Sequence, residues 1–161
     1  MEQFIKEIRA AVDGGAWILA LAGMLALPDI CAAIESPNGK TSGQKYRAWV
    51  ERWLSKKYPM VDPADLYKMR CSFLHEGEIR SSSGHPIVFT GTDPNHLFHN
   101  NLVNGAINLD LPTFCNDLTA AVGLWQAEKV NDPTYQDNVK KLIQWHPQGR
   151  APYISEIPVL S

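Results

Sequence analysis

The chain has 161 residues, of which 45% are hydrophobic and 20% are charged, and its formal net charge is −2. This length suits one domain with a real core, and disordered chains differ because they combine low hydrophobicity with high net charge. The small net charge excludes a protein that coats nucleic acid with its whole surface, although a local basic face remains possible. We therefore predict a single domain over residues 1–161.

The first quarter of the chain shows the apolar spacing of helices. In EQFIKEIRAAV the apolar residues recur on one helical face, and Gly14-Gly15 ends the pattern. The apolar run from Ala16 to Leu27 predicts a second helix that is kinked at Pro28 and continues through DICAAIES. Because a helix that crosses a bilayer needs roughly 20 apolar residues, we interpret this shorter run as a central core helix and predict no membrane segment.

Two further helices are predicted before residue 80. The third runs from about Gln44 to Lys57, with aromatic residues on its apolar stripe. The fourth has a marked start and a marked end. Asp62 is a good N-cap, Pro63 suits the first helical position, and Gly77 is placed to cap the C-terminus.

The pattern then changes to turn residues around two β-like runs, PIVFT and AINLDL, and predicts a small β-hairpin-like insert around residues 85–109. Helical spacing returns after Asp110, a possible cap, and again from Asp132-Pro133. Residues 146–161 hold three prolines and predict an extended C-terminal tail. The fold class is therefore mainly α, a five- to six-helix up-down bundle with a small insert.

The cysteines and histidines give no sign of a disulfide framework or a metal site. Three widely spaced cysteines fit reduced thiols in a cytoplasmic protein, and no CxxC spacing suggests zinc. His96 and His99 lie in a loop-like stretch, where a surface or hydrogen-bonded role is the usual one. The role of these two and of His85 in the insert is left open, and the sequence predicts no cofactor and no metal.

Basic residues are concentrated between residues 40 and 57, where six Lys and Arg stand against a single acid. On a chain of net negative charge this asymmetry is typical of a face that follows phosphates. The candidates for nucleic-acid binding are Lys40, Lys45, Arg47 and Arg52. The alternative is an ordinary solvated helix face.

The stretch DLYKMRCSFLHEG carries the candidate chemistry. Arg70 and His75 are five residues apart, roughly 7.5 Å along a helix and about 140° around it, so only a long side chain and a residue on the last turn could converge. Arginine offers a permanent charge for a phosphate passing through a pentavalent state, and histidine can take and give a proton. RNA brings its own nucleophile, the 2′-OH. The alternative is a histidine at a helix end and a surface arginine.

A helical chain with RCSFLH followed by EG at the end of an interior helix resembles the HEPN superfamily. The resemblance implies an up-down bundle, often a metal-independent RNA endonuclease of toxin or defence type, working as a homodimer with a composite cleft. It implies His75 as general acid/base, Arg70 as the group that stabilises the phosphorane, and RNA, a second copy and an antitoxin-like protein as partners. Cys71 stands where such motifs often place a polar residue, and the insert is extra to the simple bundle.

Two hypotheses follow from this stretch: a HEPN-like ribonuclease, and a non-enzymatic helical interaction module that is homodimeric. The surroundings of Arg70 separate them. An open cleft around Arg70 and His75 favours the first, whereas a buried salt bridge from Arg70 to a nearby acid such as Asp62, Asp65 or Glu76 favours the second. If the pair is functional, replacing either residue with alanine should leave the fold intact.

Overall fold

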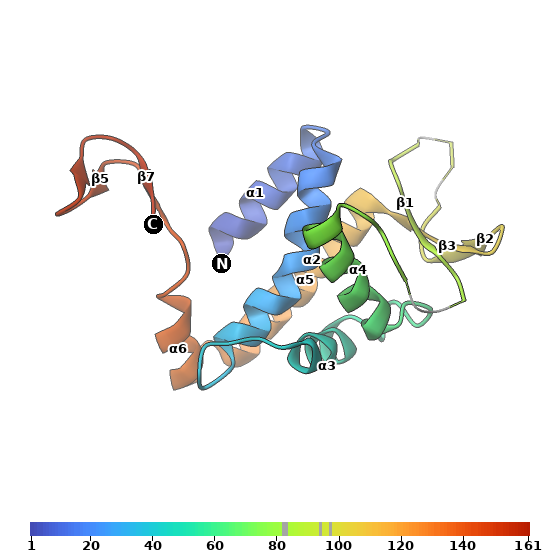
Figure 1. The fold of residues 1–161 in the computed structure, drawn as a ribbon, viewed down its shortest axis with the longest axis horizontal. Helices are drawn as coiled ribbons and strands as arrows, with labels where there is room; N and C mark the ends of the chain where they lie inside the picture. Colours follow the sequence, from blue (N-terminus) through green and yellow to red (C-terminus); the bar gives the residue numbers. More distant parts are fainter. Residues whose placement is uncertain (82–83, 94, 97) are drawn as a thin grey trace.

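The computed structural model describes residues 1–81, 84–93, 95–96 and 98–161. Within these residues the chain is mainly helical with a few small strands, as predicted (Figure 1). The helices are α1 (Glu2–Asp13), α2 (Trp17–Ile34), α3 (Gly43–Trp53), α4 (Pro63–Glu76), α5 (Leu111–Lys129) and α6 (Pro133–Val139). The strands are β1 (Ile87–Thr90), β2 (Asn101–Val103), β3 (Ala106–Asp110), β4 (Trp145–His146), β5 (Gly149–Arg150), β6 (Ile154–Ser155) and β7 (Val159–Leu160).

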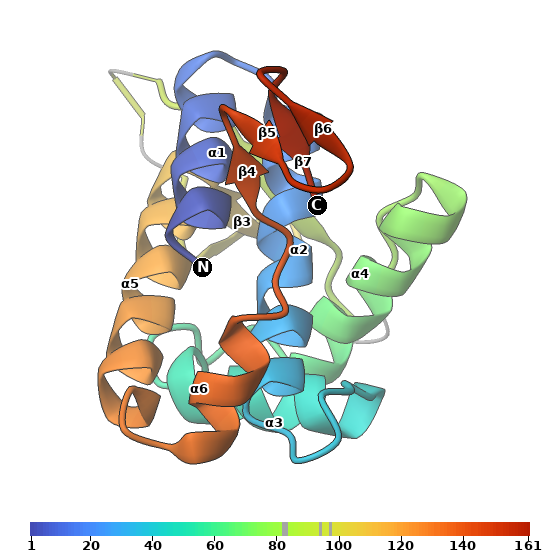
Figure 2. The same ribbon diagram turned by 90° about the vertical axis from the view of Figure 1, so that its left-hand side faces the viewer.

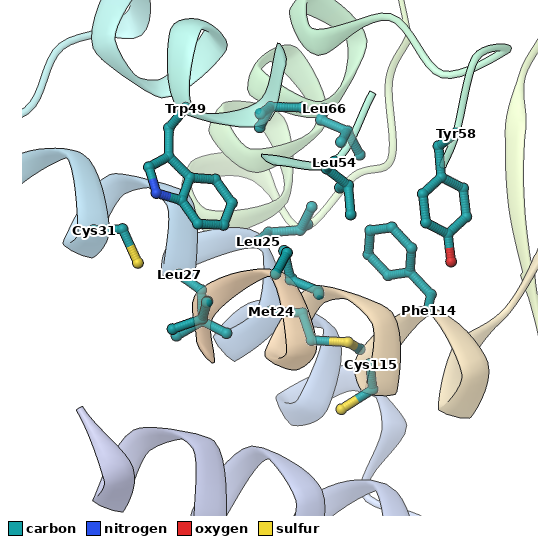
Figure 3. Packing of buried hydrophobic residues seen from close by; sticks show 14 of the residues in the cluster. Met24, Leu25, Leu27, Cys31, Trp49, Leu54, Tyr58, Leu66, Phe114 and Cys115 are labelled. Carbon is teal, nitrogen blue, oxygen red and sulfur yellow. The ribbon is translucent and has the colours of Figure 1, made fainter. Parts of the chain in front are cut away.

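Helix α2 lies at the centre of the helices and contacts α1, α3, α4, α5 and α6 (Figures 1 and 2). Its side chains Met24, Leu25 and Leu27 pack toward Trp49 of α3 and Phe114 of α5 (Figure 3). By length and composition α2 could also cross a membrane, since it runs without a break through Pro28. More than half of it is buried inside the protein, however, so we interpret it as a core helix.

The predicted helix ends are confirmed where the sequence carries a cap. The side chain of Asp62 accepts a hydrogen bond from the backbone N–H of Ala64 at 2.7 Å. Gly77 closes α4 with φ of 73°, a left-handed conformation that glycine adopts without strain. Asp110 caps α5 and Asp132 caps α6 in the same way as Asp62 caps α4. Asp62 and Gly77 together set the two ends of α4, and therefore which of its residues are helical.

The predicted insert differs from a simple hairpin. The runs PIVFT and AINLDL become β1 and β3, which pair in parallel and therefore cannot form a hairpin with each other. The three strands form a sheet of order β1-β3-β2, and the hairpin lies between β2 and β3, which pair antiparallel. Its two-residue turn is Asn104-Gly105, whose positive φ angles of 51° and 79° suit this kind of connection. Within the predicted insert, residues 94 and 97 lie outside the described residues.

The sheet belongs to the core. Ile87 of β1 and Ile107 and Leu109 of β3 are buried. Phe89 packs against Phe114 of α5, with ring centroids 5.7 Å apart. Since β3 leads directly into α5, this packing fixes the start of that helix.

Two other segments depart from the predicted pattern. Helix α3 ends at Trp53 rather than at Lys57, and the turn that follows it places Tyr58 in the core. The tail over residues 146–161 is extended in its backbone but folds back on itself, because β4 pairs with β7 and β5 pairs with β6. The turn at Pro147-Gln148 allows this return, and Gly149, the first residue of β5, adopts φ of 86°, a conformation that glycine takes without strain.

Candidate functional site

Arg70 lies on α4 and faces the central helix. Its Nε atom is 2.5 Å from the Oδ2 atom of Asp29. Asp29 is a buried residue, with 7% of its surface exposed. The Nε–H is not aligned with that oxygen, so the contact is a close ion pair rather than a well-formed hydrogen bond. The other carboxylate oxygen, Oδ1, accepts a hydrogen bond from the Thr41 hydroxyl at 3.0 Å. Asp29 is therefore held by two neighbouring segments of the chain.

The electrostatics of this pair follow from burial. A carboxylate inside an apolar helix is costly unless a cation and hydrogen bonds compensate it. Burial is the largest single influence and would lower the pKa of Arg70, but the Asp29 carboxylate and the Cys71 side chain together outweigh it, so the pKa of the guanidinium is raised. The pair joins α2 to α4, where the two helices are in contact.

Aromatic and basic side chains surround Arg70 on the α3 side. The ring of Tyr67, one turn before Arg70, lies 5.3 Å from the ring of Tyr46. The guanidinium of Arg47 sits 5.6 Å from the centroid of the Tyr67 ring, and Nη1 of Arg70 is 3.9 Å from Sγ of Cys71. The N-terminal half of α3 and the middle of α4 thus form one surface.

His75 occupies the last turn of α4 and is exposed. It forms no hydrogen bond or ion pair with any part of the chain that the structure describes. Arg70 turns toward α2, so the two predicted catalytic side chains are not brought together within one chain. The roughly 140° between positions five apart on a helix accounts for this separation.

The predicted basic face is partly neutralised. Both carboxylate oxygens of Glu128 on α5 accept from the guanidinium of Arg52, at 2.7 and 2.8 Å. The ammonium of Lys45 donates to the backbone carbonyl of Lys40 at 2.8 Å. Among the described residues Lys40, Lys45 and Arg47 have no acidic partner, so three of the four predicted nucleic-acid contacts keep their charge. Of these three, Arg47 lies over the ring of Tyr67.

The histidines of the insert have separate surroundings. Nδ1 of His85 is 2.9 Å from the Gly105 carbonyl oxygen, and the exposed His96 lies 3.2 Å from Asp93. His99 is half-buried beside Tyr58. Over the described residues, no three His, Cys, Asp or Glu side chains gather closely enough to hold a metal ion.

The residues that sequence reasoning missed are Asp29 and Thr41. A signal for Asp29 was present, because it is an acid inside an otherwise apolar helix and such a group needs a partner. That signal identifies the need but not the partner, which is 41 positions away at Arg70.

Fold and site together define a mainly helical domain with a small mixed sheet and a half-buried Asp–Arg pair at its centre. Comparison of the chain with models of known families, with curated proteins and with solved structures gave no match in any of the three. The resemblance to the HEPN superfamily therefore rests on RCSFLHEG and on the helical character of the chain.

Proposed function

We propose that this chain is a non-enzymatic helical interaction module that acts as a homodimer, with Arg70 in a structural role. The observation that carries the proposal is the ion pair between Arg70 and buried Asp29. Moving this guanidinium onto a substrate phosphate would leave a buried carboxylate unpaired, which is strongly unfavourable. The partner differs from Asp62, Asp65 and Glu76, the acids considered from sequence, but the consequence for Arg70 is the same.

Apolar side chains that could meet a second copy lie exposed on the two helices that carry this pair. Ile18 and Leu19 at the start of α2 are 74% and 70% exposed, and Leu74 on α4 is 43% exposed. Ile18 is eleven residues before Asp29 and Leu74 is four after Arg70, so each shares a helical face with its member of the pair. We name Ile18, Leu19 and Leu74 the α2/α4 surface. Exposed apolar groups of this kind mark interaction sites, and a two-fold axis would bring the same surface to both sides.

Charge placed on the α2/α4 surface should abolish association. We expect the wild-type chain to sediment at twice its 18.0 kDa mass, and the Ile18→Glu/Leu19→Glu variant to sediment as a monomer, because burying two new carboxylates in an apolar contact is unfavourable. Sedimentation velocity over a range of concentrations measures this. The matched control is Leu124→Glu on α5, where the leucine is 65% exposed and the dimer should persist. A monomeric wild type, or equal loss in the control, would contradict the proposal.

The ribonuclease is a second candidate because of the charges beside Arg70. Lys40, Lys45 and Arg47 have no acidic partner among the described residues. His75 is exposed at the end of α4, the helix that also carries Arg70. On this hypothesis His75 acts as general acid/base and Arg70 stabilises the phosphorane. Two copies would then complete the cleft, and an antitoxin-like protein would be a natural partner.

An RNA cleavage assay in EDTA separates the two candidates. For an interaction module we expect no cleavage of mixed single-stranded and structured RNA by the folded wild-type protein. Cleavage that leaves cyclic-phosphate ends, disappears in His75→Ala and persists in His96→Ala would establish the ribonuclease instead. His96 is a suitable control because it is also an exposed histidine but lies on the insert.

A further inference from the structure

A second polar cluster lies at the junction of the insert and the helices. His99, whose side chain is 13% exposed, precedes β2. Its Nδ1 atom accepts a hydrogen bond from the backbone N–H of Asp110 at 3.2 Å, and its Nε2 atom lies 3.1 Å from the Tyr58 hydroxyl. That hydroxyl donates to Oδ2 of Asp117 at 2.7 Å. Both ring nitrogens of His99 therefore have partners.

The partners determine which protons the ring carries. Burial, together with the hydrogen bond to Asp117, raises the pKa of Tyr58 well above its usual value, so the phenol keeps its proton. Since that one proton goes to Asp117, the Tyr58 oxygen can only accept from Nε2–H of His99. A backbone N–H can only donate, so Nδ1 must be unprotonated. Only the neutral Nε2–H tautomer of His99 satisfies all its neighbours.

This cluster anchors the insert to the helical body. Tyr58 follows α3, His99 belongs to the insert, and Asp110 caps α5. A second bond runs beside the first, because the Asn100 side-chain amide donates to the Lys57 carbonyl at 2.9 Å. These contacts hold the loop before β2 at the point where β3 becomes α5.

We propose that His99 is a proton-sensitive anchor whose protonation loosens the insert from the helices. A proton on Nδ1 would remove the acceptor of the Asp110 N–H and set two donors against each other. The charged groups facing the ring do not offset this. Asp117 lies 3.9 Å from Nε2 but is already paired with Lys57 at 2.5 Å and accepts from Tyr58. The Asp110 carboxylate is engaged in capping α5.

Hydrogen exchange of the full chain tests this across the range in which histidines titrate, from about pH 7.5 to about pH 5.5. After correction for intrinsic exchange rates, we expect protection of the Asp110 amide and of β2 and β3 to fall by up to about tenfold on acidification, the most that one histidine can contribute over this range. The His99→Asn variant keeps one acceptor and one donor but does not titrate, so its protection should not depend on pH. The His96→Asn control should behave like the wild type.

Three results would overturn the proposal. One is a wild-type insert whose protection is the same at both pH values. Another is a His99→Asn variant that keeps the wild-type pH dependence. The third does not depend on any variant folding: nitrogen-15 spectra of the wild-type ring that show the Nδ1–H tautomer of His99 at neutral pH.

Discussion

Replacing Arg70 with methionine is expected to lower the free energy of unfolding by about 2–4 kcal/mol. Breaking a fully buried ion pair by removing one partner costs about 3–5 kcal/mol. The Arg70 side chain is 23% exposed, so solvent screens the pair and the expected loss is smaller. The cause is Asp29, which stays 7% exposed in an apolar helix and keeps, among the described residues, the Thr41 hydroxyl as its one remaining partner. Denaturant unfolding followed by circular dichroism measures the change.

Two further variants make the result specific. His75→Ala removes the exposed member of the predicted catalytic pair and should change the free energy of unfolding by about 0.5 kcal/mol or less. Asp29→Leu combined with Arg70→Met should recover most of the loss, because an apolar pair can replace a buried ion pair without penalty. An Arg70→Met protein as stable as the wild type would instead show that Arg70 is free for chemistry, and the ribonuclease would become the better hypothesis.

The parts of this fold that could be predicted from sequence are those with a local cause. Asp62 and Gly77 delimit α4 because an N-cap acts on the next few amides and a C-cap glycine on its own φ angle. The Asn104-Gly105 turn had an equally local signal, the preferred dipeptide of a two-residue hairpin. The parallel pairing of β1 and β3 had none, because it joins segments separated by about twenty residues.

The candidate site was predictable only in part for the same reason. Helical spacing placed Arg70 and His75 on different sides of α4, and the structure agrees with that separation. The contact with Asp29 depends on how α2 crosses α4, which periodicity within either helix does not determine. His99 shows the same limit: a loop-like sequence favoured a surface or hydrogen-bonded role, but its partners Tyr58 and Asp117 come from segments that only the fold brings together.

The end of α2 offers the second large effect, through Asn138 of α6. A helix leaves its last carbonyl groups without partners, and here the buried Asn138 amide donates to the carbonyls of Ile34 and Ser36 at 3.0 and 2.8 Å. Asn138→Asp keeps the shape but replaces the donor with a carboxylate oxygen facing two carbonyl oxygens. We expect a loss of about 2–4 kcal/mol in the free energy of unfolding at neutral pH, from two lost hydrogen bonds and a buried charge. The Lys141 ammonium, which donates to Oδ1 of Asn138 at 2.8 Å, would offset that charge only in part.

The pH dependence of this variant distinguishes charge from shape. The new carboxyl group would hold its proton more tightly in the folded chain than in the unfolded chain, where aspartate titrates near about pH 3.9. Its stability deficit relative to the wild type should therefore shrink as the pH falls toward that value. Asp137→Asn, at the exposed neighbouring position, is the control and should change stability by about 0.5 kcal/mol or less. If both variants behave alike, α6 does not hold the end of α2 through Asn138, and its docking must rest on the packing of Tyr135 and Val139 and on the hydrogen bond from Gln126 to the Tyr135 hydroxyl.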